Sequence, residues 1–143
     1  MIKELYEYST NIPKAFAFTN SAILLEYLGT EQFPAPKLNE VNLNRDEVIF
    51  CFNEVIQNIE LFIEFGFVHG DLSAYNILWW NKQPYIIDFP QTLDIKSNKF
   101  AYDRFNKDLK NIENFFNYSI DNNYLNKVIA KLKHQFNNKR IYG

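Results

Sequence analysis

Between residues 44 and 66, hydrophobic side chains recur at steps of three and four residues along an otherwise polar stretch. The recurring positions are Val48, Cys51, Phe52, Val55, Ile56, Ile59, Phe62 and Ile63. Such steps place side chains on one face of a helix, while Asn44 is a suitable N-terminal cap and Gly66 a suitable terminator. The pattern predicts one long amphipathic helix that packs on a core.

Two more helices are predicted towards the C-terminus, over residues 103–118 and 121–137. Their apolar positions again follow a helical period, with Leu109, Ile112, Phe115 and Phe116 in the first helix and Leu125, Val128, Ile129 and Leu132 in the second. A short helix is also expected over residues 1–9. Proline cannot continue a helix, so Pro13 marks the latest point at which this one can end.

Short apolar runs separated by turn residues predict strands in the first part of the chain. Residues 14–19 and 22–28 are expected to pair across a turn at Asn20 and Ser21. After Gly29 the chain should become an extended connector, because it carries Pro34 and Pro36.

Further short strands are predicted around a polar loop in the middle of the chain. They span residues 67–68, 77–80 and 85–88, with a turn at 81–83 and an irregular stretch at 91–101. Together with the helices, these strands predict an α+β fold in a single structural unit, with the loop held at the rim of the strands.

Composition narrows the class of protein. The chain has 143 residues, 47% of them hydrophobic and 22% charged, which is typical of one globular domain. Its 14 Phe and 9 Tyr predict a core filled by aromatic rings. The single cysteine, Cys51, excludes an intrachain disulfide framework and is expected to be a buried, inert thiol.

Charge and hydropathy give no signal for a nucleic-acid or membrane partner. The net charge is −2, and the basic residues near the C-terminus (Lys131, Lys133, Lys139 and Arg140) suit a solvated helix face better than a nucleic-acid patch. No apolar run reaches the roughly 18 residues of a membrane span, and the first residues do not resemble a signal peptide. We expect a cytoplasmic protein.

The polar loop carries the chemistry. Residues 67–78 read FVHGDLSAYNIL, and residues 86–90 read IIDFP. Phosphoryl transfer needs a group that orients the nucleophile and oxygen ligands for Mg²⁺. Asp71 is placed to accept a hydrogen bond from an attacking hydroxyl or water, while Asn76 and Asp88 offer oxygen ligands. The spacing predicts that these three residues meet at one metal-nucleotide site.

Each of these residues also has a structural interpretation when it is taken alone. Asp71 could form a turn, Asn76 could cap the loop, and Asp88 could end a strand. The three together, at this spacing and with these apolar flanks, favour the functional interpretation. His69 is expected to be a packed, hydrogen-bonded scaffold residue, because Asp71 already fills the role of a base.

The same residues resemble the RIO family of atypical serine/threonine protein kinases. The resemblance rests on residues 69–78, HGDLSAYNIL, where Ser73 matches the serine that the family favours, and on residues 85–91, YIIDFPQ. Residues 24–29, LLEYLG, are similar to the family's hinge, and residues 34–38 to the segment that follows it. The similarity runs from about residue 10 to residue 118.

The resemblance implies a bilobal kinase fold, with residues 1–28 as a remnant of the N-lobe and the start of the hinge, and residues 29–143 as the C-lobe. It implies that backbone groups of Glu26 and Leu28 hold the adenine of ATP, that Asp71 is the catalytic aspartate, and that Asn76 and Asp88 hold Mg²⁺. His69 and Ser73 would support the loop.

Family members phosphorylate serine in proteins, often in themselves, or act as ATPases during maturation of the small ribosomal subunit. In some of them, the aspartate that matches Asp88 is transiently phosphorylated. The resemblance therefore makes an ATPase cycle an alternative to protein phosphorylation.

The chain also departs from the family. The Gly-rich strand pair, the ATP-binding lysine and its helix glutamate should precede residue 1, and none of Gly29, Gly66, Gly70 and Gly143 belongs to such a motif. The loss of one electrostatic stabiliser typically costs about 100- to 1,000-fold in rate. We therefore expect impaired catalysis, or a complementing N-lobe chain.

Two other functions are open at this point. One is a pseudokinase or interaction module that transfers no phosphate. The other is a small-molecule kinase of the aminoglycoside or choline type, against which Ser73 and the pair Pro90-Gln91 argue. In each case a missing upper lobe predicts exposed apolar surface on the strands at 14–28, and with it association or poor solubility.

Overall fold

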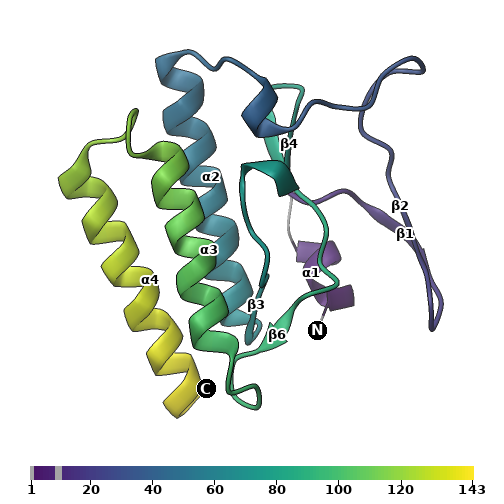
Figure 1. Ribbon diagram of the computed structural model, residues 1–143. Helices are drawn as coiled ribbons and strands as arrows, with labels where there is room; N and C mark the ends of the chain where they lie inside the picture. The colour runs from purple at the N-terminus through teal and green to yellow at the C-terminus, as the bar shows by residue number, and fades with distance from the viewer. Residues whose placement is uncertain (1, 9–10) are drawn as a thin grey trace.

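The computed structural model describes residues 2–8 and 11–143. Three long helices lie side by side, and the short strands and the connecting loops lie against one side of them (Figure 1). The helices are α2 (Arg45–Glu64), α3 (Ala101–Phe116) and α4 (Asn122–Tyr142). The architecture is thus a mixture of helices and small sheets, as the α+β prediction requires.

Helix α2 begins and ends where its sequence predicts. The Asn44 side chain accepts a hydrogen bond from the backbone N–H of Glu47 at 2.9 Å, and the Glu47 side chain accepts one from the N–H of Asn44 at 3.0 Å. This reciprocal capping box satisfies two N–H groups that the helix leaves open. After the helix, Gly66 has a φ of +88°, a conformation that glycine adopts without steric cost.

The helices pack through aromatic rings, as the composition predicts. The ring of Phe52 on α2 meets Phe116 on α3 at a centroid distance of 5.2 Å, and Phe105 on α3 stacks on Phe136 of α4 at 4.7 Å. Cys51 is buried in the same core, and burial, with a smaller effect of Glu54, raises the pKa of its thiol to about 12. The predicted burial of Cys51 is confirmed, and a raised thiol pKa is what an unreactive cysteine requires.

Both C-terminal helices differ from their predicted bounds. Helix α3 starts and ends two residues earlier than expected, and α4 continues to Tyr142 instead of ending at residue 137. No proline or glycine interrupts residues 123–142, so nothing in the sequence stops the helix before Gly143.

The strands form three separate antiparallel pairs. These are β1 (Ala15–Phe18) with β2 (Ile23–Leu25), β3 (Phe67–Val68) with β6 (Leu93–Asp94), and β4 (Ile77–Trp80) with β5 (Gln83–Ile86). The predicted hairpin over residues 14–28 is present, but its second strand ends at Leu25.

Two predictions in this region were wrong. The strand expected at 85–88 lies at 83–86, because Asn81 and Lys82 both take positive φ angles and form a two-residue turn that starts the strand earlier. Residue 88 then leaves the strand. In addition, the stretch 91–101 is not wholly irregular, because β6 pairs with β3 there. A strand of two residues is too short to show alternation in a sequence.

The N-terminal segment packs against the loop region. Helix α1 (Ile2–Tyr8) buries Leu5, and the ring of Tyr6 meets Phe18 at 5.8 Å and Phe89 at 6.2 Å. The first and last residues of the predicted helix, 1 and 9, and residue 10 after it lie outside the described part of the chain. The extended connector is confirmed, and it joins β4 through a hydrogen bond of 2.9 Å from the N–H of Trp79 to the carbonyl of Pro36.

The β1–β2 hairpin is exposed, as predicted. Phe16 is 66% and Leu24 is 62% exposed, while Phe18 is partly covered by Tyr6. The expected effect on solubility stays a prediction. Among the described residues, no helix has the length and apolar character needed to cross a bilayer.

Candidate active site

The loop between β3 and β4 is built on a buried histidine. His69 is 1% exposed; its Nε2–H donates to the carbonyl of Ile87 at 2.8 Å, and its Nδ1 accepts from the N–H of Asp71 at 3.2 Å. Both ring nitrogens are thus occupied in the neutral ring. Burial is the main cause that lowers the His69 pKa, so the ring stays neutral at pH 7. His69 is the packed scaffold residue that the sequence predicts.

Gly70 lets the loop pass close to the segment that follows Asp88. Its φ is +89°, and a Cβ atom at this position would lie 2.3 Å from the carbonyl oxygen of Gln91. No side chain fits between these two backbone segments. The close approach therefore depends on glycine at position 70.

Asn76 ties the loop back to Asp71. Its Nδ2 donates to the backbone carbonyl of Asp71 at 2.7 Å and to Oδ2 of the Asp71 carboxylate at 3.3 Å. This leaves the Oδ1 of Asn76 as an acceptor. The turn between them is the 3₁₀ helix η2 (Ala74–Asn76), and Ser73 caps it by accepting from the N–H of Tyr75 at 3.3 Å.

Asp88 lies close to Asn76 because it follows β5, which pairs with β4. The N–H of Ile87 donates to the carbonyl of Asn76 at 3.0 Å, which continues the β4–β5 pairing by one step. Asp88 itself has a φ of +67° and an exposed side chain. Its neighbour Phe89 is buried and contacts the His69 ring at 4.9 Å. The exposed carboxylate of Asp88 is therefore adjacent in sequence to the buried ring of Phe89.

Asp108, which the sequence interpretation missed, fixes the loop to helix α3. Asp108 on α3 is 3% exposed, and its two carboxylate oxygens accept from the N–H groups of Gly70 at 2.8 Å and Leu72 at 2.9 Å. One turn further along α3, the side chain of Asn111 donates to the carbonyl of Leu72 at 3.1 Å. The loop is therefore fixed to α3 on both sides of Asp71.

The environment of Asp108 changes its acidity. Burial raises the pKa of its carboxyl to about 6, although the two backbone N–H donors act in the opposite direction. The sequence did contain a signal for this residue, because Asp108 stands on the apolar face of α3 between Phe105 and Ile112. A charged residue on a core-facing stripe needs a polar partner.

The polar groups at the rim are oxygen donors. The described residues contain no cluster of three or more His, Cys, Asp or Glu side chains that could hold a metal ion. Zinc-type sites usually need such a cluster, whereas Mg²⁺ is commonly held by one or two protein ligands and by phosphate oxygens. The amide oxygen of Asn76 and the carboxylate of Asp88 suit Mg²⁺ by their chemistry.

The two predicted adenine-binding residues lie after the hairpin, at the start of the connector. The N–H of Glu26 donates to the carbonyl of Lys14 at 2.7 Å, and the carbonyl of Leu28 accepts from the N–H of Ala35 at 2.9 Å. Among the described contacts, the carbonyl of Glu26 and the N–H of Leu28 make no hydrogen bond within the chain. Of the predicted residues, hydrogen bonds link Asp71, Asn76 and the backbone beside Asp88, but none joins Glu26 or Leu28 to them.

The family model of the RIO domain matches residues 1–129. The chain is similar to the RIO-type serine/threonine-protein kinase Rio1 of Thermoplasma acidophilum, with 34% identity over 104 residues, which are 73% of this chain and 53% of that protein. It is also 34% identical to Rio1 of Methanocaldococcus jannaschii over 116 residues, which are 80% of this chain and 39% of the relative.

A human relative gives the same result. The chain is 30% identical to the human serine/threonine-protein kinase RIO3 over 105 residues, which are 73% of this chain and 20% of the human protein. The matched part is about half of the Thermoplasma protein and a smaller share of the other two. The family model covers most of the chain. The two motifs that carry the resemblance, residues 69–78 and 85–91, are joined by a backbone hydrogen bond. The chain belongs to the RIO domain family.

Proposed function

We propose that the chain carries the catalytic loop and the metal ligands of a RIO-type serine/threonine protein kinase or ATPase. The observation that carries this proposal is that Asn76, in the first motif, forms hydrogen bonds both to Asp71 and to the backbone beside Asp88. Its side chain bonds to Asp71, and its carbonyl accepts from Ile87, next to Asp88. Residues 71, 76 and 88, which are separated in sequence, are thereby linked at one rim.

In this proposal Asp71 orients the nucleophile. Its Oδ2 receives the Asn76 amide, and no other described side chain donates to its Oδ1, which leaves that oxygen for the proton of an attacking hydroxyl or water. The backbone on either side of Asp71 is held by Asp108, so the carboxylate is positioned before substrate binds.

Asn76 and Asp88 are the proposed ligands of Mg²⁺. Their donor set is made of oxygen, which this hard cation prefers, and Asp88 is exposed enough to be shared with phosphate oxygens. When bound, Mg²⁺ would neutralise charge on the phosphates of ATP. The Asn76 amide would then serve two purposes, because its nitrogen fixes Asp71 while its oxygen faces the metal.

The start of the connector is the proposed adenine site. The carbonyl of Glu26 and the N–H of Leu28 offer one acceptor and one donor, which matches the amino group and a ring nitrogen of adenine. We also propose the lobe assignment on this basis, with residues 1–28 belonging to the N-lobe and hinge and residues 29–143 to the C-lobe.

One observation favours a second candidate, a pseudokinase or interaction module that transfers no phosphate. Within the described part of the chain, the ion pairs are Lys110–Glu113 and Lys131–Glu60, and neither includes Asp71 or Asp88. Phosphoryl transfer requires positive charge against the phosphate oxygens. The described ion pairs place no basic side chain at either carboxylate. In the first candidate a complementing N-lobe chain would supply this charge, and phosphorylation of a protein substrate or of the chain itself, like a role in ribosomal-subunit assembly, would depend on that chain.

Titration with ATP in the presence and absence of Mg²⁺ tests the proposal. We expect Mg²⁺-dependent binding that Asp88→Ala abolishes and that Asp103→Ala, an exposed aspartate on α3, leaves unchanged. Nucleotide binding without any dependence on Mg²⁺ or Asp88 would contradict the assignment of the metal ligands.

Turnover separates the two candidates. If the chain binds Mg²⁺-ATP and hydrolyses it or phosphorylates serine, Asp71→Asn should reduce the rate by at least about 100-fold while binding persists. Binding without turnover would favour the pseudokinase. Phosphate transfer to an aminoglycoside or to choline, but not to protein, would instead indicate a small-molecule kinase.

A further inference from the structure

Helix α3 presents one side to the loop of the candidate active site (Figure 1). Asp108 and Asn111 on this side form hydrogen bonds to the loop backbone. Residues three or four positions apart lie on the same side of a helix, about one turn from each other. Arg104 precedes Asp108 by four positions, and Lys107 precedes Asn111 by four. Both basic residues therefore lie beside the loop, closer to the start of α3.

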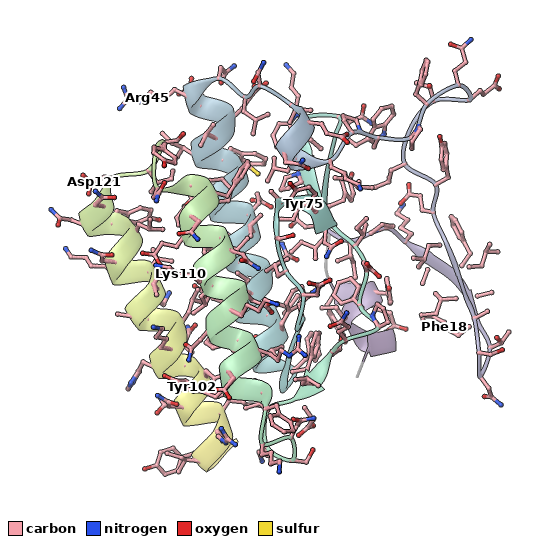
Figure 2. All side chains as sticks on the ribbon, viewed as in Figure 1. Phe18, Arg45, Tyr75, Tyr102, Lys110 and Asp121 are labelled. Atoms are coloured by element: carbon pink, nitrogen blue, oxygen red, sulfur yellow. The ribbon has the colours of Figure 1, made fainter. Side chains whose placement is uncertain are left out.

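Arg104 and Lys107 are exposed, and no ion pair among the described residues includes them. The third basic residue of α3, Lys110, pairs with Glu113 at 3.7 Å. Figure 2 shows the labelled Lys110 towards the α4 side of α3, and the labelled Tyr75 of the loop region on the opposite side. The two basic side chains beside the loop, which we call the basic pair, can therefore bind an anion without breaking an ion pair of the chain.

The basic pair is also close to Asp71 in electrostatic terms. Burial is the main cause that raises the pKa of Asp108, and among the nearby charges Asp71 acts in the same direction while Lys107 acts in the opposite one. Such effects weaken with distance, so both charges lie near the same carboxylate. Asp103, one turn before Lys107, forms no ion pair with it. The positive charge of Lys107 is therefore available beside the group that we propose to orient the nucleophile.

The basic pair offsets negative charge at the rim. The carboxylates of Asp71 and Asp88 would by themselves repel an acidic peptide. A guanidinium binds a carboxylate through two parallel hydrogen bonds, and a neighbouring ammonium adds a second positive charge. We propose that Arg104 and Lys107 bind an acidic side chain of a protein substrate beside its phosphoacceptor serine. This inference rests on the proposed kinase function, in which Asp71 accepts the hydrogen bond of the serine hydroxyl.

The geometry limits where the acidic residue stands in the substrate. Side chains one turn apart on a helix have Cβ atoms roughly 5 to 6 Å apart. Because Asp108 bonds to the N–H groups on both sides of Asp71, the basic pair lies about one helix turn from the backbone that carries Asp71. An extended peptide advances about 3.3 Å per residue, so we expect the acidic residue within about three residues of the serine.

Fluorescence anisotropy of labelled peptides, without nucleotide, tests the proposal. A peptide with a serine flanked by glutamates should bind more tightly than its glutamine or lysine versions, and added salt should weaken the binding. Arg104→Glu combined with Lys107→Glu should raise the dissociation constant of the glutamate peptide at least about tenfold. The control, Lys110→Glu combined with Lys127→Glu, changes the net charge equally on other surfaces and should raise it by no more than about threefold. Circular dichroism confirms that both variants are folded.

A crosslink tests where the peptide binds. In Asp71→Cys, a peptide with cysteine in place of the serine can form a disulfide, and buried Cys51 should not react. The glutamate form should crosslink at least about tenfold faster than the glutamine form, because the basic pair holds it at the loop. Charge reversal at the basic pair should remove this difference. Asn122→Cys, an exposed position at the start of α4, should show no such preference.

The outcomes separate this inference from the proposed function. Equal binding of the glutamate and glutamine peptides, tighter binding of the lysine peptide, or tighter binding of an oligonucleotide at the basic pair would overturn the inference. If Mg²⁺-dependent ATP binding persists in such a case, the proposed function is unaffected. If instead the chain prefers the glutamate peptide but binds no ATP, the proposed function is overturned, and with it the role of the peptide as a substrate.

Discussion

At the scale of single residues, Gly70 shows how strongly one position can be constrained. Gly70 and Gly66 have nearly the same φ, +89° and +88°, but different surroundings. A Cβ at position 70 would lie 2.3 Å from the Gln91 carbonyl, whereas at position 66 the nearest atom is a side-chain carbon of Lys139 at 3.7 Å. Substitutions at Gly66 and Gly70 therefore separate the effect of backbone strain, which both positions share, from that of a steric clash, which only position 70 has.

Gly70→Ala should therefore destabilise the protein more than Gly66→Ala. The positive φ costs each variant about 1 to 2 kcal/mol, and the clash at position 70 adds about 1 to 3 kcal/mol. Urea denaturation followed by circular dichroism measures both losses. Equal losses in the two variants would show that Gln91 moves away from the loop without cost.

Asp108 gives a pH prediction with a definite sign. Its pKa rises from 3.8 in the unfolded chain to about 6 in the folded protein, so folding favours the protonated form. The stability contributed by this group is present below pH 4 and is lost as the pH rises to 6, by about 3 kcal/mol. In Asp108→Asn the group no longer titrates, so wild type should lose stability relative to the variant between pH 4 and 6.

Urea denaturation at a series of pH values provides the measurement. Asp103→Asn, an exposed position on the same helix, is the matched control for the loss of one carboxylate. At every pH, Asp108→Asn should also lose one acceptor for the N–H groups of Gly70 and Leu72. A pH-independent difference for Asp108→Asn would contradict the prediction.

At the scale of elements, the sequence predicted what local patterns determine. Helix α2 was found from its apolar period and from Asn44, whose cap is a contact within four residues. Strand β6 was missed because it exists only through β3, 26 residues earlier in the chain. Its two residues carry no periodic signal of their own.

The same distinction applies to the candidate site: the residues in local motifs could be predicted from the sequence, and those that act through distant contacts could not. The spacing of Asp71, Asn76 and Asp88 indicated the loop, because the residues belong to two nearby motifs. The contribution of Asp108 could not be derived from spacing, since its hydrogen bonds reach residues 36 and 38 positions away. A buried carboxylate on an apolar helix face predicts a partner, but it does not say which backbone groups form it.

At the scale of the whole molecule, two buried asparagines connect segments that are distant in sequence. The side chain of Asn58 on α2 donates to Oδ1 of Asn11 at 2.8 Å, and Asn11 donates to the carbonyl of Pro84 at 3.2 Å. Both asparagines are 4% exposed. They join α2, the segment after α1 and strand β5.

Asn58→Ala should therefore destabilise the whole protein by about 1 to 3 kcal/mol, because buried polar groups lose a partner. Gln57→Ala, the exposed neighbour on the same helix, should change the stability by less than about 0.5 kcal/mol. Urea denaturation of the two variants is the measurement. A stability of Asn58→Ala equal to that of wild type would mean that water replaces the contact.

The contacts around the loop have a consequence for how the proposed site is aligned. Asp71 is held by the helical half of the molecule, through Asp108 on α3. Asp88 directly precedes Phe89, whose ring contacts Tyr6 in the N-terminal segment as well as His69 and Phe62 of α2. Both carboxylates are thus anchored to the helices and to the loop, and Asp88 is in addition linked, through Phe89, to the N-terminal segment. We therefore expect a molecule that displaces the N-terminal segment to act on the proposed site through Asp88 and not through Asp71.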